Sequence, residues 1–168
     1  SQEVMLMTSK GQAIRFNSDE VRSMGRASYG VTGIKLKDND QVVSLEIVKS
    51  NTKQSILTIT EKGYGKRSAV EDYRLIGRAG RGVINLKVSE KTGKVVNTIP
   101  VIDKDQMIVT TTKGIAMKTT LNDIRVMGRA TQGVRIIKLN QGDRVSDIAK
   151  LKRDEEVDQE IEELEKSN

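Results

Sequence analysis

Short apolar segments separated by polar turns fill the chain from residue 3 to about residue 152. The first segment, residues 3–8, breaks at a Lys-Gly pair and is followed by a second short segment, a pattern that predicts a β-hairpin. The same break, with a threonine three residues before the glycine, occurs three times, at Gly11, Gly63 and Gly114. We therefore expect one hairpin at each of these glycines.

Two further apolar segments follow each hairpin. In the first of them a lysine stands between apolar residues, so it faces the side opposite to them, as a half-buried strand requires. These alternating segments cover residues 31–36, 83–88 and 134–139. The last segments cover residues 42–48, 95–102 and 145–151. Each unit is therefore predicted to contribute four short antiparallel strands.

A ten-residue motif, R-x-[MI]-G-R-A-x-x-G-V, lies between the hairpin and the alternating segment of every unit. Its Gly-Arg-Ala begins at residues 25, 77 and 128, so the period is 52 and then 51 residues. A period near fifty residues is typical of stacked copies of one structural unit. We predict an all-β fold, a pinwheel or propeller-like array of three four-stranded antiparallel blades. The body, residues 1–153, is divided into repeats at about residues 3–51, 55–104 and 106–152.

The last segment, residues 154–168, differs sharply from the body in charge. It holds eight acidic residues against one lysine, a net charge of −7. The rest of the chain carries 28 Lys and Arg (29 less Lys166) and 15 Asp and Glu (23 less eight), a net charge of +13. The apolar residues of the tail are spaced for one weakly amphipathic helix, but its charge also fits disorder. A basic body with an acidic tail indicates a polyanionic partner.

The sequence contains no cysteine and no histidine. This excludes disulfides, Cys/His zinc sites and the usual acid-base catalysts, so we expect no cofactor and no enzyme active site in this chain. No apolar run approaches the roughly 20 residues of a membrane span. Residues 1–3 resemble neither a signal peptide nor a natural start, so we expect a piece of a longer, cytoplasmic protein.

The second arginine of each motif is the strongest candidate for contact with nucleic acid. Arg26, Arg78 and Arg129 lie on predicted turns, from which a guanidinium can reach phosphate oxygens with two donors. Glycines at both ends of the loop, such as Gly77 and Gly82, are predicted to have a positive φ. The alternative for the arginine is an ion pair with the acidic residue before the motif of the same copy, Glu20, Asp72 or Asp123. Phosphate contact is favoured because the body has far more cations than its acids can pair.

Other basic side chains also recur once per unit. They are a basic residue four positions after the hairpin glycine, the first arginine of the motif and the lysine of the alternating segment. The first arginine of the motif could instead hold the blade together, and the lysine of the alternating segment could simply face solvent. The full set of predicted DNA contacts is Arg15, Arg22, Arg26, Lys35, Arg67, Arg74, Arg78, Arg81, Lys87, Lys118, Arg125, Arg129, Arg135 and Lys138.

The few aromatic residues indicate a duplex rather than a single strand. Single-strand binders stack bases on aromatic side chains, whereas the one Phe and three Tyr of this chain occupy four different positions of the repeat. Binding through phosphates, without sequence specificity and with bending of the duplex, is therefore favoured.

The motif, preceded by a threonine, a Lys-Gly turn and a basic strand end, resembles the blade repeat of the C-terminal domain of DNA gyrase A and of its topoisomerase IV relative. The resemblance covers residues 3 to about 152, and the acidic tail also resembles the end of gyrase A. It implies a β-pinwheel whose basic rim wraps duplex DNA in support of negative supercoiling by an ATP-dependent type II topoisomerase at the nucleoid. The implied partners are duplex DNA, the rest of gyrase A and the gyrase B protein, with no membrane.

Two departures from the family pattern leave alternatives open. The Q-R-R-G-G-R-G box of gyrase A is absent, and the nearest stretch is residues 76–82, so topoisomerase IV is an alternative parent. The family domain usually has more than three blades, so we expect the last blades of a longer domain, whose uncovered end faces favour self-association. A protein-interaction propeller that binds an acidic partner is the other alternative.

Overall fold

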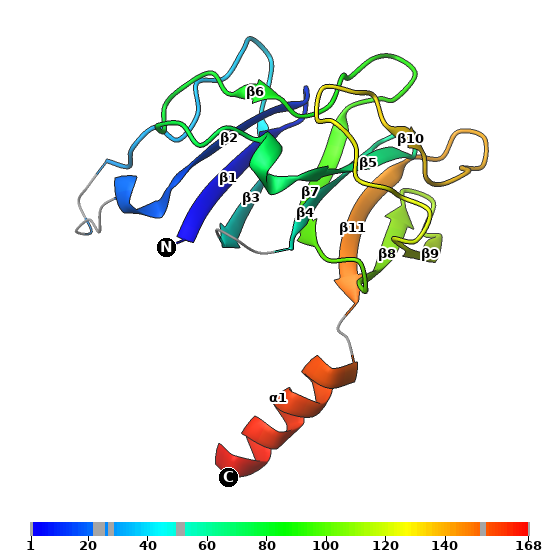
Figure 1. Ribbon diagram of the computed structural model, residues 1–168. Helices are drawn as coiled ribbons and strands as arrows, with labels where there is room; N and C mark the ends of the chain where they lie inside the picture. The colour runs from blue at the N-terminus through cyan, green and yellow to red at the C-terminus, as the bar shows by residue number, and fades with distance from the viewer. Residues whose placement is uncertain (1, 22–25, 27–28, 50–52, 152–153, 168) are drawn as a thin grey trace.

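The computed structural model describes residues 2–21, 26, 29–49, 53–151 and 154–167, which form three β-sheets, two 3-10 helices and one α-helix (Figure 1). The strands are β1 (Gln2–Thr8), β2 (Gln12–Asn17), β3 (Val42–Lys49), β4 (Ser55–Thr60), β5 (Tyr64–Ala69), β6 (Val83–Ile84), β7 (Val95–Val101), β8 (Gln106–Thr111), β9 (Ala116–Thr120), β10 (Val134–Arg135) and β11 (Val145–Leu151). The helices are η1 (Ser18–Glu20), η2 (Val70–Asp72) and α1 (Asp154–Ser167). No helix among the described residues has the length and apolar character needed to span a membrane.

Each sheet is built around one of the predicted hairpins. Strands β1 and β2, β4 and β5, and β8 and β9 pair antiparallel across the three Lys-Gly turns. The last strand of each repeat, β3, β7 or β11, pairs antiparallel with the first strand of its own hairpin. Pro100 lies on β7, an edge strand of its sheet, which is where proline is tolerated in sheets. The predicted all-β fold of antiparallel blades is thus confirmed.

The alternating segment does not pair within its own blade, contrary to the prediction. Strand β6 of the second repeat pairs with β2 of the first hairpin, and β10 of the third repeat pairs with β5 of the second. The paired part is only two residues long, because the chain then turns so that the N–H groups of Asn85 and Leu86 both donate to the carbonyl oxygen of Gly11, at 2.7 and 3.3 Å. The first two sheets therefore have the orders β3-β1-β2-β6 and β10-β5-β4-β7, each with one strand from the next repeat.

The third sheet and the first alternating segment differ from their counterparts. Among the described residues the third sheet has three strands in the order β11-β8-β9, and no strand pairs with the outer edge of β9. The first repeat was expected to form a strand over residues 31–36, but here that segment makes only one parallel bridge, between Ile34 and Gly80. The predicted strand is therefore not formed in this repeat; the equivalent segments of the other two repeats pair with the hairpin of the preceding repeat, and the described residues contain no such hairpin before residue 31 other than the repeat's own.

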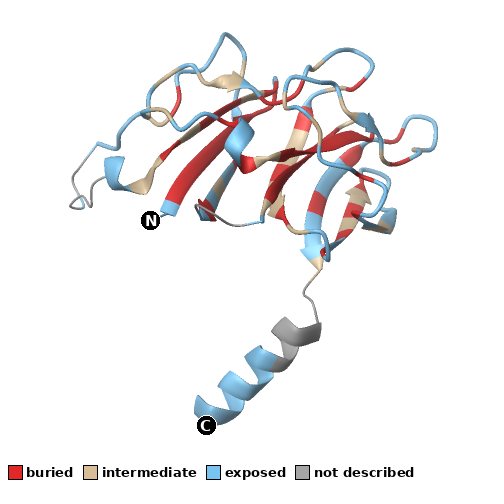
Figure 2. Cartoon of the chain, in the orientation of Figure 1, coloured by how far each residue is buried: buried red, intermediate tan, exposed pale blue. Residues whose placement is uncertain are grey.

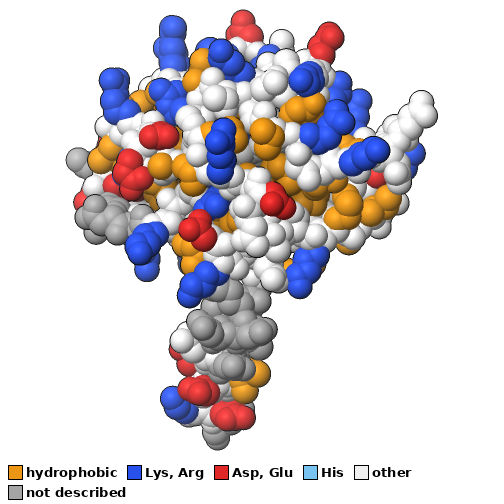
Figure 3. Space-filling view, turned by 45° about the vertical axis from the view of Figure 1, so that its right-hand side comes forward, with side chains coloured by type: hydrophobic (Ala, Val, Ile, Leu, Met, Phe, Trp, Pro, Cys, Tyr) orange, Lys and Arg blue, Asp and Glu red, His pale blue; other side chains and the backbone are white. Residues whose placement is uncertain are grey.

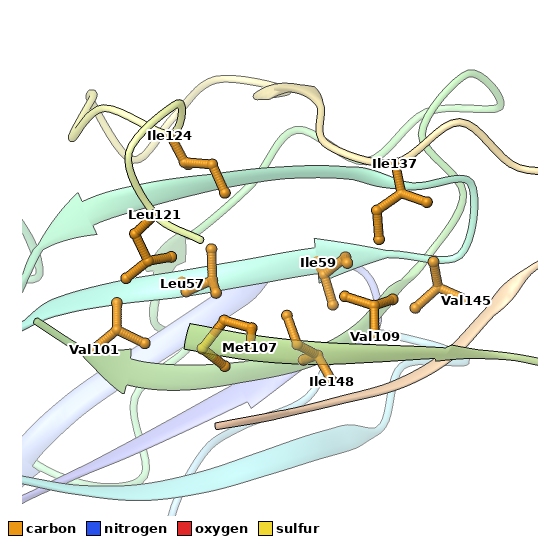
Figure 4. Close-up of a cluster of buried hydrophobic side chains, with 10 residues drawn as sticks. All are labelled: Leu57, Ile59, Val101, Met107, Val109, Leu121, Ile124, Ile137, Val145 and Ile148. Atoms are coloured by element: carbon orange, nitrogen blue, oxygen red, sulfur yellow. The ribbon is translucent and has the colours of Figure 1, made fainter. Parts of the chain in front are cut away.

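The hydrophobic core lies between the blades. One cluster joins Leu57 of the second blade to Met107 of the third (Figure 4), and another joins Met5 of the first blade to Ile56 and Tyr73 of the second repeat. Buried residues follow the central strands, while the loops and turns are largely exposed (Figure 2). The packing of one blade on the next therefore stabilises the array, as expected for a repeat protein.

The acidic tail forms α1, which points away from the sheets (Figure 1). This is one of the two predicted alternatives. The side chains described from residue 159 to residue 167 are exposed, including those of Ile161 and Leu164. The side chains of Ile161 and Leu164 on the helix therefore stay in solvent.

Candidate nucleic-acid interface

The three hairpin turns share one geometry. The glycines have φ values of +87°, +84° and +83°, and their N–H groups donate to the carbonyl oxygen of the threonine three residues earlier at 3.0–3.1 Å. The hydroxyl oxygen of that threonine accepts the N–H of the residue after the glycine, at 3.0–3.2 Å. These bonds fix the turn and place one exposed lysine at the tip of each blade, Lys10, Lys62 or Lys113.

The turn lysines are held in place by the neighbouring turn. The ammonium group of Lys10 donates to the carbonyl oxygen of Asp38 at 2.8 Å, and that of Lys113 donates to Gln141 at 2.9 Å. Lys62 makes the equivalent bond. Each cation is therefore positioned while its side chain stays exposed to solvent.

Open grooves lie beside these turns, where a hairpin meets the alternating segment of the next repeat. Lys10 of the first hairpin and Lys87 of the second repeat line one groove. Lys62 of the second hairpin and Lys138 of the third repeat line another. The same pair of cations, one from each of two successive repeats, thus occurs twice.

Further cations extend this arrangement. Lys35 and Lys37 of the first repeat lie in a third groove with Arg81 of the second. Arg135 lies in the Lys62 groove, where its guanidinium carbon is 5.5 Å from the centre of the Tyr64 ring. Figure 3 shows Lys and Arg side chains spread over the upper part of one face. We name the grooves and the three turn lysines together the basic rim.

Two arginines of the motif loops fasten one repeat to the preceding one. Arg78 donates through Nε to the carbonyl oxygen of Glu20 at 3.2 Å and through Nη1 to that of Thr32 at 3.0 Å. Arg129 makes the equivalent bonds to the second repeat. The acceptors are backbone carbonyls of the preceding repeat, not the carboxylates of the same repeat that the alternative interpretation expected. Both side chains are half-buried, whereas Arg26 is exposed.

In the second and third loops only the second glycine has the predicted positive φ, and Gly30 of the first loop does not have it. The values are +78° at Gly82 and +76° at Gly133. A Cβ atom at Gly82 would lie 2.3 Å from the carbonyl oxygen of Ala13 on the preceding blade. The prediction is wrong for Gly77, because the left-handed turn is made by Ala79, with a φ of +66°.

The basic strand end of each of the first two blades bonds to the following repeat. Arg67 donates to the carbonyl oxygen of Ile124 at 3.2 Å and pairs with Asp103 at 2.6 Å. Arg15 donates to the carbonyl oxygen of Tyr73 at 2.9 Å. Because Arg67 is only 5% exposed, we assign it to the junction between blades and not to DNA.

Lys66 is a buried cation at the junction between the second blade and the third repeat. The residues at the equivalent position of the first and third blades are apolar, Ile14 and Met117. Its ammonium group donates to the carbonyl oxygens of Gly128, at 3.2 Å, and Arg129. Burial, together with the nearby charge of Arg129, lowers the pKa of Lys66 to about 7.

The other predicted contacts lie at the surface, apart from Arg22, which lies outside the described residues. The exposed side chains are those of Arg26, Lys35, Arg74, Arg81, Lys87, Lys118, Arg125, Arg135 and Lys138. The turn lysines were not among the predicted contacts, because the Lys-Gly pairs were interpreted only as signs of a turn. Their recurrence at one position per repeat was the available signal.

Antiparallel blades joined by strands from the following repeat, as the first two are here, define the β-pinwheel class of repeat protein. The chain belongs to the DNA gyrase C-terminal domain, beta-propeller family, whose family model matches residues 2–49, 54–102 and 105–152. The resemblance to gyrase seen in the motif is thus confirmed.

The relatives place this chain within longer proteins. It is 43% identical to the DNA gyrase A protein of Chlamydia pneumoniae over 159 residues, which cover 94% of the chain and 19% of the relative. The same identity holds for the Salmonella typhimurium protein over 161 residues, 94% of the chain and 18% of the relative. The chain therefore spans about a fifth of the length of these curated relatives.

Two solved structures share the fold. A DNA gyrase A C-terminal domain has a TM-score of 0.81 at 30% identity, with 90% of this chain and 51% of that chain covered. The C-terminal domain of a DNA topoisomerase IV has a TM-score of 0.88 at 26% identity, with 99% of this chain and 52% of that chain covered. The chain thus matches about half of each solved domain.

Proposed function

We propose that this chain binds duplex DNA along the basic rim, without sequence specificity, and bends the duplex across successive blades. Cations repeated from blade to blade suit the phosphates of a duplex, which carry no sequence information. The proposed contacts are Lys10, Lys62, Lys113, Lys35, Lys87, Lys138, Arg81 and Arg135, with the exposed Arg26, Arg74, Lys118 and Arg125 beside them.

The observation that carries this proposal is the recurrence of one cation pair. Lys10 with Lys87, and Lys62 with Lys138, line equivalent grooves on successive blades. A duplex that follows these grooves must curve with the array. The cost of the curvature depends on DNA deformability and is offset by the additional phosphate contacts.

We further propose that the chain acts as the DNA-wrapping part of a type IIA topoisomerase that introduces negative supercoils. Its partners would be the rest of gyrase A and the gyrase B protein, in the cytoplasm at the nucleoid. This proposal rests on the curated relatives, which are DNA gyrase A proteins several times longer than this chain. In it, the catalytic residues belong to the rest of the enzyme.

Wrapping is tested by the topology of relaxed circular DNA. The chain is added together with a relaxing topoisomerase, and the linking number is read after the protein is removed. We expect a shift in linking number that grows with chain concentration, and a steep loss of affinity for random duplex as salt rises, because counterions are released. An unchanged linking number would disprove wrapping, and an affinity insensitive to salt would disprove phosphate binding.

A matched pair of variants tests the position of the interface. The triple change Lys10→Glu, Lys62→Glu and Lys138→Glu reverses charges in the grooves. The control reverses Lys49, Lys53 and Lys104, exposed lysines near the opposite ends of the strands. We expect the groove variant to bind at least about tenfold more weakly than the control. Equal losses would show that net charge alone governs binding, and tight binding of polyglutamate by the parent chain would favour an acidic protein partner.

A further inference from the structure

An aspartate lies beside the turn lysine of the third blade. Oδ1 of Asp143 accepts the backbone N–H of Lys113 at 3.1 Å and the hydroxyl of Thr112 at 2.9 Å. It also accepts the N–H of Arg144, the next residue, at 2.8 Å. Asp143 ends the neighbouring turn, in which the carbonyl oxygen of Gln141 holds the ammonium group of Lys113. One carboxylate oxygen thus joins the turn lysine to the turn that holds its side chain.

The first blade repeats this arrangement. Oδ1 of Asp40 accepts the backbone N–H of Lys10 and the hydroxyl of Ser9, both at 3.0 Å. It accepts the N–H of Gln41 at 2.8 Å as well. The same three kinds of donor therefore surround the carboxylates of Asp40 and Asp143.

The second blade satisfies the same backbone groups with different residues. By the strand register, Gly93 occupies the position of these aspartates. The backbone N–H of Lys62 donates instead to the carbonyl oxygen of Thr92 at 3.1 Å. The N–H of Lys94 donates to Oε2 of Glu61, the residue just before the turn lysine, at 3.1 Å. An acceptor for the N–H of the turn lysine is therefore present in all three blades.

The charge of the two aspartates indicates that they hold the turn. A carboxylate beside the basic rim repels phosphate, so its presence there requires a gain that offsets the repulsion. Burial raises the pKa of Asp143, but the hydrogen bonds that its carboxylate accepts lower it more, to about 2, and the pKa of Asp40 is lowered by the same balance. Hydrogen bonds to an ionised acceptor are stronger than neutral ones. The gain is therefore a firmly held turn.

We propose that Asp40 and Asp143 are positioning residues of the DNA interface, which hold Lys10 and Lys113 so that each turn lysine contacts one phosphate. This inference rests on the proposed binding of DNA along the basic rim. An ammonium group has three donors, and the neighbouring turn uses one of them, so two are left for phosphate oxygens. A side chain that is already held loses less conformational entropy when it binds.

Bonds between repeats extend this effect along the rim. The carbonyl oxygen of Ser9 accepts the N–H of Val95 in the next repeat at 2.8 Å, and that of Glu61 accepts the N–H of Val145 at 2.8 Å. Ser9 also donates its hydroxyl to Asp40. A residue next to the turn lysine is thus bonded both to its own neighbouring turn and to the following blade. A firmly held turn therefore also fixes the spacing of the lysines that a bent duplex meets.

Hydrogen exchange measured by NMR tests the structural part of this proposal without DNA. Asp143→Ala should speed exchange of the Lys113 amide at least about tenfold, because its acceptor is removed. The Gly114 amide donates to the carbonyl oxygen of Thr111 in the same hairpin turn at 3.0 Å. It is the internal control, and its exchange should change less than about threefold. Equal exchange of the Lys113 amide in the parent and the variant would overturn the proposal.

The salt dependence of binding to a random-sequence duplex tests the functional part. Each phosphate contact contributes about 0.9 to the magnitude of the slope of log K against log salt. Lys113→Gln should therefore reduce this magnitude by about 0.9. Asp143→Ala should reduce it by a similar amount, although it makes the chain more positive, and the double variant should reduce it no further. Asp123→Ala, which removes an exposed carboxylate of the same repeat, is the control and should leave the slope unchanged.

The results separate this inference from the proposed function. If Lys113→Gln reduces the slope and Asp143→Ala behaves like Asp123→Ala, the positioning role is overturned while binding along the rim stands. If Lys113→Gln has no effect, the turn lysine does not contact phosphate, which overturns this contact of the proposed interface together with the inference. Should Asp143→Ala melt below the temperature of the assay, Asp40→Ala with Lys10→Gln repeats the test on the first blade.

Discussion

The substitution Gly82→Val tests how strongly one blade depends on the next repeat. Gly82 has a φ of +78°, and its Cα faces the carbonyl oxygen of Ala13 at the point where β6 meets β2. A Cβ there would lie 2.3 Å from this oxygen and 2.9 Å from its carbon. Both are backbone atoms inside a sheet, so they cannot rotate away as a flexible side chain could.

Two contributions set the size of the effect. A non-glycine residue with a left-handed backbone costs about 1–2 kcal/mol, and more when it is β-branched. Relief of the contact must separate β6 from β2, which weakens the bonds from Asn85 to Gly11 and from Ile76 to Arg15, at 2.7 and 2.9 Å. At about 1 kcal/mol for each hydrogen bond, the expected loss of unfolding free energy is about 3–4 kcal/mol.

Urea unfolding followed by circular dichroism measures this loss. For a chain of this size, 3 kcal/mol corresponds to a fall in melting temperature of about 6–12 °C. Gly128→Val is the control, because its loop is exposed and a Cβ there meets nothing within 4 Å. A loss below about 1 kcal/mol for Gly82→Val, or equal losses for both variants, would refute the idea that this contact fixes the junction.

Two more predictions concern the buried cations at the junctions. Arg67→Met should lower the unfolding free energy by about 2 kcal/mol, because it removes the bonds to Ile124 and Asp103. Lys118→Met, at the equivalent but exposed position, should change the unfolding free energy by no more than about 0.5 kcal/mol. Urea unfolding in dilute solution measures both values. The pKa of Lys66 is lowered from 10.5 to about 7, so between these pH values the folded chain binds fewer protons than the unfolded chain, and stability should rise with pH. Lys66→Met should remove this rise between about pH 7 and pH 9, and an unchanged slope would show that Lys66 titrates normally in the folded chain.

The sequence predicted the strands well but assigned some of them to the wrong sheet. The hairpins and the last strand of each repeat follow from local apolar patterns, and β11 occupies the predicted residues 145–151. Strand exchange could not be predicted, because a segment such as residues 83–88 has the same pattern whichever hairpin it joins. Its partner is decided by the approach of Gly82 to Ala13, which is a long-range contact.

In the candidate site, too, the local pattern predicted some features correctly, whereas features that depend on long-range contacts were not predicted. Lysines of the alternating segment were predicted to face outward, and Lys35, Lys87 and Lys138 are indeed exposed. Arg67 was misjudged, because charge and recurrence alone do not separate a cation that binds a ligand from one that bonds to neighbouring carbonyls. Burial decides between the two, and burial depends on how the next repeat packs.

Strand exchange also bears on how such an array can grow. Because the second and third repeats each give a strand to the preceding repeat, the boundary between repeats does not coincide with the boundary between blades. A gene duplication that inserts one whole repeat between two others adds a donor and an acceptor of the same type, so the lengthened array has no additional unpaired edge. Blade number can therefore change in single steps by recombination between repeats, whereas a duplication of half a repeat would leave a hairpin without its fourth strand.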